Sequence, residues 1–104
     1  MRRIFVKRAR FIVFKLERNY GYIDNIVVAK DEQKKGIGKK LVGYVETSAK
    51  SKGINEMMTD TTENANGIPW GSYNFWLRLG YEDTGKRLLT KYDFKEIQLI
   101  KKII

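Results

Sequence analysis

The chain has 104 residues, 42% of them apolar, which suits one globular domain with one hydrophobic core. It contains no cysteine and no histidine, which excludes disulfide frameworks, thiol nucleophiles, Ser/His/Asp triads and metal sites built on imidazole or thiolate. Its 21 basic residues against 12 acidic ones give a formal charge of +9, which favours an anionic partner such as a polyphosphate, a nucleic acid or a membrane surface. The same excess of lysine also suits a heat-adapted protein with a solvated charged surface.

The location of the protein follows from the apolar pattern. The chain has no uninterrupted run of roughly 18 apolar residues, and its start is basic where a secretory signal would have an apolar centre. We therefore expect a single domain over residues 1–104 that is cytoplasmic and has no membrane partner.

The chain begins with predicted strands. Residues 10–16 (RFIVFKL) are rich in β-branched and aromatic types, and a turn signal at 19–21 separates them from a second predicted strand at 22–29. These two strands predict a hairpin. Residues 4–7 predict a further short strand ahead of it.

A helix follows the hairpin. Apolar residues recur at three- and four-residue steps over residues 38–52, which predicts an amphipathic helix that ends at Gly53. Residues 54–62 then predict a strand, and 63–67 (ENANG) a polar turn.

The last part of the chain predicts a second helix and two closing strands. Pro69 suits the first turn of a helix that runs to Leu79 and is ended by Gly80. Residues 81–86 and 95–103 predict strands, although 95–103 also tolerates a helical interpretation. The element order predicts an α/β fold with a mixed, mostly antiparallel sheet and two crossover helices.

The segment between the hairpin and the first helix, residues 27–40 (VVAKDEQKKGIGKK), carries the strongest chemical signal. The first turn of a helix offers unpaired amides that bind phosphate, and Gly36 and Gly38 let the backbone approach a ligand closely. A lysine-rich helix start is also typical of a solvated face, and the segment lacks the Walker and dinucleotide-binding patterns. The lysines that add positive charge here are Lys34, Lys35, Lys39 and Lys40.

Two motifs resemble a known family. Residues 33–38 (QKKGIG) follow an apolar strand, with Val28 five residues before Gln33, and residues 75–81 (FWLRLGY) end the second helix. In these motifs and the elements between them, roughly residues 27–81, the chain resembles the GNAT family of N-acetyltransferases. That family has Gln or Arg, two residues, Gly, one residue and Gly or Ala after a strand, and later Phe-Tyr, three residues and Gly-Phe. The resemblance implies a truncated acyl-CoA N-acyltransferase-like fold with acetyl-coenzyme A as co-substrate.

The resemblance also implies a site for acetyl-coenzyme A. Strand backbone would bind the pantetheine arm, and the amides of the glycine turn would hold the diphosphate. A primary amine would then attack the thioester directly, with no covalent enzyme intermediate. The implied cofactor-binding residues are Ile26, Val27, Val28, Gln33, Lys34, Lys35, Gly36, Ile37, Gly38, Lys39, Asn66 and Trp76; no metal is implied.

The catalytic residues depart from the family pattern. Trp76 stands where the family usually has the tyrosine that protonates the coenzyme A sulfur, and an indole N–H is not an acid at neutral pH. Tyr73, about one helical turn earlier, is the expected replacement, and Asp24 the expected base, with Asp60 a second candidate. Tyr73 and Trp76 also fit a role as packing aromatics, with solvent protonating the thiolate, and both carboxylates fit a surface role.

The beginning of the chain is a second departure. The family normally has another strand and one or two helices before its central hairpin, elements that wall the acceptor site. We expect an open acceptor cleft, or one completed by a second subunit, and a homodimer because an uncovered sheet edge favours pairing.

Three functions remain in competition. The first is an acetyl-coenzyme A-dependent N-acetyltransferase acting on a primary amine of an unidentified acceptor, for which positive charge favours acidic neighbours over a cationic polyamine. The second is a coenzyme A-binding module without catalysis, suggested by Trp76 and the short start. The third, which lacks helix-turn-helix and RNA-recognition signatures, is a nucleic-acid-binding protein. Its phosphate-contacting patch would be Arg2, Arg3, Lys7, Arg8 and Arg10.

Overall fold

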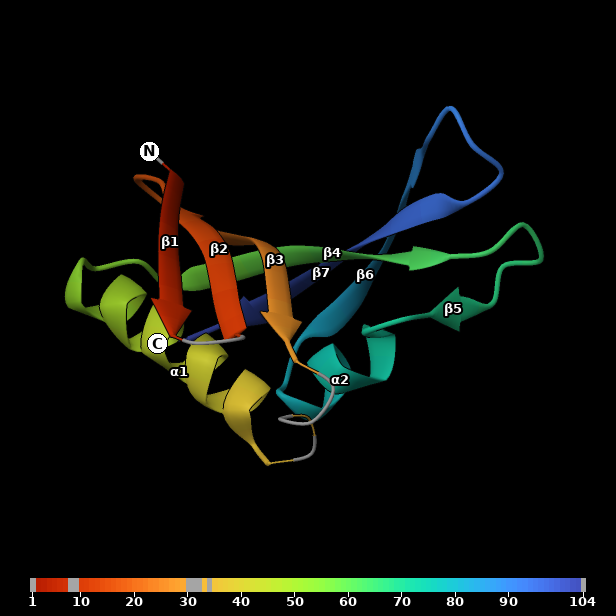
Figure 1. Cartoon of the computed structure of the whole chain (residues 1–104). Helices are drawn as coiled ribbons and strands as arrows, with labels where there is room; N and C mark the ends of the chain where they lie inside the picture. Colours follow the sequence, from red (N-terminus) through yellow and green to blue (C-terminus); the bar gives the residue numbers. More distant parts are fainter. Residues whose placement is uncertain (1, 8–9, 30–32, 34, 104) are drawn as a thin grey trace. The chain divides into compact units, whose positions relative to one another are not determined.

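The computed structural model describes residues 2–7, 10–29, 33 and 35–103, with residues 2–7 described by their backbone. The chain has the predicted α/β fold, with strands that pair mostly antiparallel and two helices (Figure 1). It divides into two compact units, the first Met1–Met57 with Lys102–Ile104 and the second Met58–Lys101. The expectation of one domain over residues 1–104 stays a prediction.

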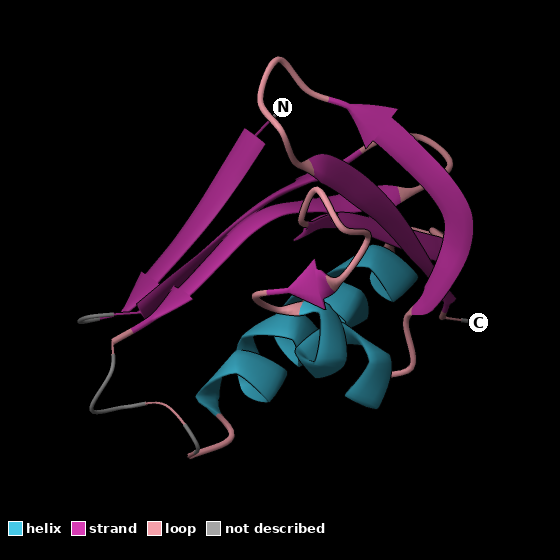
Figure 2. Ribbon diagram, turned by 90° about the vertical axis from the view of Figure 1, so that its right-hand side faces the viewer, coloured by secondary structure: helices cyan, strands magenta, loops and turns pink. Residues whose placement is uncertain are grey.

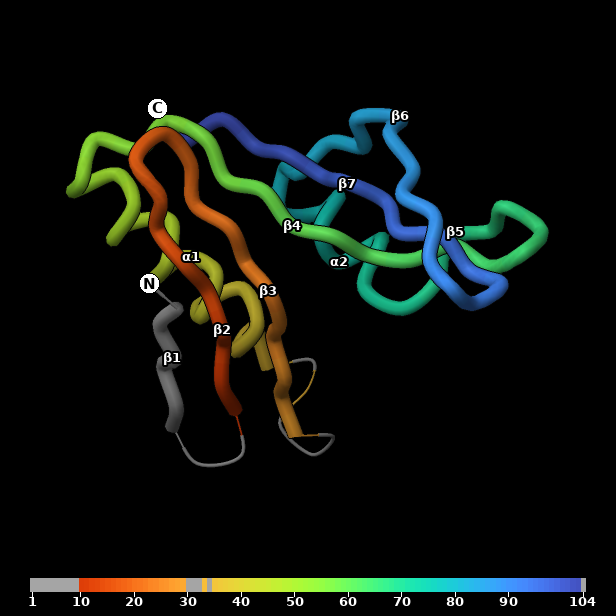
Figure 3. Tube along the Cα trace, turned by 90° about the horizontal axis from the view of Figure 1, so that it is seen from above, coloured from red at the N-terminus to blue at the C-terminus, as the bar shows by residue number. Residues whose placement is uncertain are grey.

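The first unit holds the predicted hairpin and the short strand before it. β1 (Arg2–Lys7), β2 (Arg10–Leu16) and β3 (Gly21–Val28) pair antiparallel in sequence order, and β2 and β3 lie side by side in Figure 3. The Glu17 amide donates to the Tyr20 carbonyl at 2.9 Å and closes the predicted turn.

A β-bulge interrupts the pairing of β2 with β3. Val13 pairs with Asn25 and Phe14 with Ile23, so Asp24 is the extra residue of β3. The buried alternation of β3 stops at this point, and Val27 beyond it is 39% exposed. A bulge bends its strand and redirects side chains, and such bulges are frequent next to active sites.

The long helix α1 (Ile37–Ser51) packs against β2 and β3 (Figure 2). Its Tyr44 ring, half exposed, meets Phe14 of β2 edge to face at 6.5 Å between ring centroids. Gly53, with φ 77°, ends the helix as the sequence predicts. The residues of α1 that form the buried stripe are Ile37, Leu41, Val42, Val45 and Ala49.

The second unit is built on strands paired around β7 (Lys95–Lys102). Their order is β4 (Glu56–Glu63), β7 and β6 (Glu82–Leu89), and the short β5 (Pro69–Trp70) pairs with β4. β4 and β7 run alongside each other in Figure 3. β7 is a strand, so the helical interpretation of residues 95–103 is wrong. The second helix is α2 (Tyr73–Arg78).

The predicted helix start at Pro69 is also wrong, because Pro69 belongs to β5. The Asn64 side chain accepts the Ile68 amide at 3.0 Å and folds the loop back onto β4, where residues 69 and 70 pair with Glu63 and Thr62. Gly71, with φ 66°, follows this short strand and turns the chain toward α2. The helix is therefore only 6 residues long.

A large bulge interrupts β6. Asp83 pairs with Leu99 and Arg87 with Ile97, so four steps along β6 oppose two along β7. Gly85, with φ 83°, lies within the bulge and permits its turn. The strand runs to Leu89, three residues beyond its predicted end.

No helix of the described ranges is long and apolar enough to cross a membrane.

Candidate functional site

The end of β3 and the basic turn are joined by a hydrogen bond between the two residues whose spacing marks the first motif. The Gln33 side-chain amide donates to the Val28 carbonyl at 3.0 Å. The five-residue spacing therefore has a physical reason, because the glutamine closes the turn on the last residue of the strand. Ile26 and Val28 are half-buried, and Val27 is exposed.

The start of α1 lacks a side-chain cap. Gly36 is the cap residue, with φ 76° and ψ 12°, and its carbonyl accepts the Lys40 amide at 3.1 Å. A non-glycine side chain is strained at this φ, which explains the glycine. The first-turn amides of Ile37, Gly38 and Lys39 precede the first bond of the helical ladder and are available to an anion.

The charge around this helix start favours an anionic ligand. The first turn of α1 has no acidic residue, and the side chains of Lys35 and Lys39 are exposed. The positive end of the helix dipole adds to their charge. Lys34, the other lysine expected to bind cofactor, lies outside the described residues.

Asp24, the expected base, is exposed and occupies the bulge of β3, two residues before Ile26. Asp24, the expected pantetheine-binding strand and the start of α1 thus all lie in the first unit. Its role as a base stays a prediction.

Trp76, in the second unit, is a core residue. It is 2% exposed, and its ring meets Tyr81 edge to face at 5.0 Å between ring centroids. The indole N–H donates to the Ser72 hydroxyl at 3.1 Å, and the Ser72 and Thr61 hydroxyl oxygens lie 3.3 Å apart. A buried tryptophan usually finds such a partner. The N–H of Trp76 is therefore engaged within its own unit.

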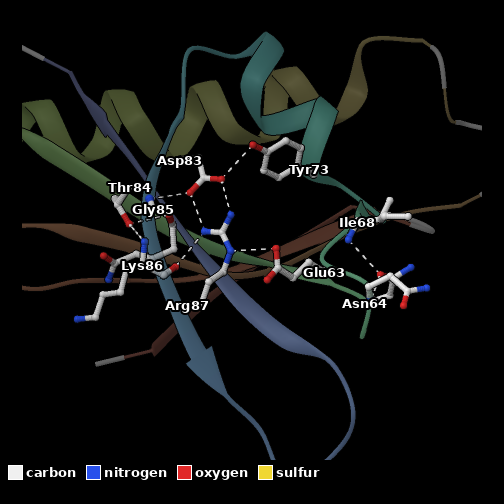
Figure 4. Close-up of polar contacts among 11 residues, drawn as sticks. Glu63, Asn64, Ile68, Tyr73, Asp83, Thr84, Gly85, Lys86 and Arg87 are labelled. Carbon is white, nitrogen blue, oxygen red and sulfur yellow. Dashed lines mark hydrogen bonds and ion pairs between the residues drawn. The ribbon is translucent and has the colours of Figure 1, made fainter.

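Tyr73 belongs to a charged network with Asp83, Arg87 and Glu63 (Figure 4). The Tyr73 hydroxyl lies 3.0 Å from Asp83 Oδ2. The two Nη atoms of Arg87 donate to the two carboxylate oxygens of Asp83, each at 2.9 Å, and its Nε donates to Glu63 Oε2 at 3.0 Å. The Gly85 amide donates to Asp83 Oδ1 at 2.8 Å. A two-pronged contact between arginine and a carboxylate is among the stronger polar interactions in proteins.

These contacts shift the pKa values of Asp83 and Tyr73 in opposite directions. The hydrogen bonds from Arg87, followed by those from Gly85 and Tyr73, lower the pKa of Asp83 from 3.8 to about 2 against the effect of burial. Burial, followed by the hydrogen bond to Asp83, raises the pKa of Tyr73 above 10.0. Asp83 is therefore an anion at neutral pH, and Tyr73 is a neutral phenol.

Asn66, the remaining expected cofactor residue, is exposed in the turn between β4 and β5. Its amide donates to the Asn64 side chain at 2.9 Å. The expected residues thus fall into two groups: Asp60, Asn66, Tyr73 and Trp76 belong to the second unit, and the others belong to the first.

The partners of Tyr73 follow from no motif in the sequence. Asp83 lay in the predicted strand 81–86 and Arg87 just beyond its end, and residues four apart along a regular strand do not have their side chains together. Only the bulge of β6 does so. Gly85 between them was the one available signal, since a glycine inside a strand often marks a bulge.

Several solved structures share the fold of this chain. An aminoglycoside 6'-N-acetyltransferase complexed with coenzyme A matches with a TM-score of 0.79 and 20% identity, over 97% of this chain and 71% of that chain. The aminoglycoside 6'-N-acetyltransferase from Enterococcus faecium has a TM-score of 0.78 and 20% identity, over 97% and 73%. The structure of the NatC complex bound to Gag peptide and CoA matches with 0.73 and 26%, over 90% and 60%.

A search of curated proteins found no significant match. The family model described as the acetyltransferase (GNAT) family, in contrast, matches residues 6–81. This match covers more than half of the chain and includes both motifs, residues 33–38 and 75–81. The resemblance seen in the sequence is thus confirmed, and the chain belongs to the acetyltransferase (GNAT) family.

Proposed function

We propose that the chain is an acetyl-coenzyme A-dependent N-acetyltransferase that transfers the acetyl group directly to a primary amine. The observation that carries this proposal is the start of α1, where amides without a side-chain cap directly follow a turn that Gln33 ties to the end of β3. A helix start without a side-chain cap or first-turn acid suits a diphosphate. Family membership supplies the donor, acetyl-coenzyme A.

The cofactor is proposed to bind in two parts. The backbone of Ile26, Val27 and Val28 would hydrogen-bond the pantetheine arm as an added strand does. The amides of residues 36–39 would hold the diphosphate, with Lys35 and Lys39 adding charge. Gln33 would contribute by fixing the turn, and Trp76, being buried, by packing. Lys34 and Asn66 stay in the proposal as flanking contacts.

The proposed reaction is a direct displacement. The amine nitrogen attacks the thioester carbon, a C–N bond forms, and the C–S bond breaks as the tetrahedral intermediate collapses. The nitrogen loses a proton, for which Asp24 is the proposed base, and the departing thiolate gains one. Tyr73 of α2 is proposed to contact the reacting groups through its hydroxyl.

The acceptor is proposed to be an amine with acidic neighbours. The similar structures include aminoglycoside 6'-N-acetyltransferases and the NatC complex bound to Gag peptide and CoA. The formal charge of +9 repels cationic polyamines and attracts acidic groups. An acidic peptide with a free amino terminus is therefore the first acceptor to test, and an aminoglycoside the second.

Free thiol release tests the function. The protein is incubated with acetyl-coenzyme A and an acidic peptide, a neutral peptide, an aminoglycoside or spermidine, and thiol is followed with a chromogenic disulfide. We expect thiol release that depends on an added amine and is fastest for the acidic peptide. Tight binding of coenzyme A without release for any amine would select the non-catalytic module instead. A titration with a DNA duplex tests the third function, because salt-dependent affinity would support nucleic-acid binding.

We further propose a cytoplasmic homodimer. The second unit exposes large apolar side chains, and apolar surface left open to solvent favours association. The edge of β6 is less suited to pairing, since its bulge interrupts the ladder between Asp83 and Arg87. The residues that support the proposal are Leu89 (83% exposed), Tyr92 (62%), Ile68 (58%) and Trp70 (55%).

Leu89→Glu tests the dimer, because it places a charge on the most exposed of these apolar side chains. We expect wild type to sediment as a dimer and Leu89→Glu as a monomer in analytical ultracentrifugation. Asn19→Glu, which adds the same charge at an exposed turn of the first unit, should remain dimeric. A monomeric wild type would contradict the proposal.

A further inference from the structure

The network around Tyr73 fixes the direction of its hydrogen bond. An ionised carboxylate accepts hydrogen bonds and donates none. Asp83 is gripped by both Arg87 Nη atoms at 2.9 Å and by the Gly85 amide at 2.8 Å, and these donors stabilise its anionic form. In the 3.0 Å contact between Tyr73 and Asp83 the proton therefore lies on Tyr73 and points at Asp83.

Arg87 is itself anchored. Its Nε donates to Glu63 at 3.0 Å, and Glu63 is 7% exposed on β4. The guanidinium is thus held between a carboxylate on β4 and another on β6. A chain of contacts from Glu63 through Arg87 and Asp83 to Tyr73 orients the phenol, as Figure 4 shows.

The oxygen of Tyr73 can then offer only lone pairs to other groups. A phenol has one proton and two acceptor lone pairs, and the proton is taken by Asp83. A departing thiolate is itself an acceptor and is mismatched to this oxygen. An amine is matched, because its N–H groups are donors.

We propose that Tyr73 meets the acceptor amine as a hydrogen-bond acceptor and does not protonate the departing thiolate, with Asp83 and Arg87 as the residues that position it. This inference rests on the proposed N-acetyltransferase function. It replaces the role of acid expected for Tyr73 from the sequence. Asp24 remains the proposed base for the amine proton, and the proton for the thiolate then comes from solvent.

The first test reads the proton of Tyr73 without any turnover. Tyrosine labelled with 13C at Cζ is titrated by NMR, with the Tyr73 signal assigned from Tyr73→Phe. We expect Tyr73 to stay protonated beyond the ordinary tyrosine pKa of 10.0, because burial, Asp83 and Glu63 oppose its ionisation more than Arg87 favours it. Asp83→Asn removes the anionic partner and should lower this pKa. Ionisation of wild-type Tyr73 at or below 10.0 would overturn the inference.

The second test separates the two roles by kinetics, with the acidic peptide as amine and acetyl-coenzyme A saturating. We expect Tyr73→Phe to raise the KM for the peptide about tenfold, the loss of about one hydrogen bond, with kcat within about threefold of wild type. A proton donor would instead lose about 100-fold or more in kcat, with KM little changed, and that result would overturn the inference. A Tyr44→Phe control should change neither.

Asp83→Asn tests the positioning role. We expect it to raise the same KM, and the double variant with Tyr73→Phe to show no further increase, since both remove one interaction. A purely structural role would lower the folded fraction and hence apparent kcat, leaving KM unchanged, and would count against the inference. If wild type acetylates none of the four amines, the proposed function fails, and the NMR titration alone decides whether Asp83 holds the Tyr73 proton.

Discussion

Gly38→Asp should abolish coenzyme A binding and leave the protein folded. Gly38 lies in the first turn of α1, where a carboxylate stabilises the helix through its dipole by about 0.5 kcal/mol. The same carboxylate would face the diphosphate that the first-turn amides are proposed to hold. Two like charges about 4 Å apart near a protein surface repel by about 4 kcal/mol, so we expect affinity to fall at least about 100-fold. Isothermal titration calorimetry measures the loss.

Gly43→Asp is the matched control. Gly43 lies in the middle of the same helix, and a Cβ there would meet nothing within 4 Å. The variant carries the same substitution on the same helix, away from its start, so we expect coenzyme A affinity within about threefold of wild type. If Gly38→Asp bound coenzyme A as tightly as Gly43→Asp, the diphosphate would not lie at the start of α1.

Arg87→Met should produce the largest loss of stability. The change removes the shared partner of Asp83 and Glu63 and leaves two carboxylates without their cation. Removing one partner of a buried pair costs about 3–5 kcal/mol, and the Arg87 side chain is 27% exposed, so we expect about 2 kcal/mol. Urea unfolding measures the difference. Lys86→Met, the loss of an exposed neighbouring charge, should cost less than about 0.5 kcal/mol.

The loss at Arg87 should depend on pH. Asp83 has a folded-state pKa of about 2, below its ordinary value of 3.8, so its stabilising effect is complete above the ordinary value and disappears as the pH falls toward about 2. A shift of this size corresponds to about 2 kcal/mol. The difference between wild type and Arg87→Met should therefore shrink between pH 4 and pH 2. A difference that is constant over this range would contradict the assigned role of Asp83.

The elements whose sequences carry a clear period were predicted correctly. The alternation of β2 and the apolar stripe of α1 each bury one face, and Gly53 ends the helix through its positive φ. The turn between Gln33 and Gly36 was recognised from its motif, and the Gln33 to Val28 hydrogen bond now gives that motif a physical basis.

The element that depends on side-chain hydrogen bonds within a turn was not predicted. Pro69 is compatible with a helix start. In the structure, however, the Asn64 side chain accepts the Ile68 amide, and the loop folds back so that residues 69 and 70 pair with β4 as a strand. The preference of proline for the first turn of a helix therefore counts for less here than the turn that begins at Asn64, five residues earlier. Proline remains tolerated there because β5 is a short strand of 2 residues.

The network at Tyr73 was beyond sequence reasoning for a similar cause. It requires a register shift in β6, which no alternation of residue types announces, and a partner, Glu63, 24 residues from Arg87 in the sequence. The motif placed Trp76 correctly in the helix, but its burial depends on tertiary packing against Tyr81. Site chemistry in this chain thus depends on contacts that the motifs do not encode.

The account depends most on the start of α1 as the site that holds the diphosphate of coenzyme A. The direct measurement is the 15N-amide NMR spectrum of Ile37, Gly38 and Lys39 during titration with coenzyme A and, separately, with pantetheine, which lacks the diphosphate. We predict large downfield shifts of these amides with coenzyme A alone, and at least about 100-fold weaker binding of pantetheine. Unchanged amides in the coenzyme A complex, or equal affinity for pantetheine, would contradict the account.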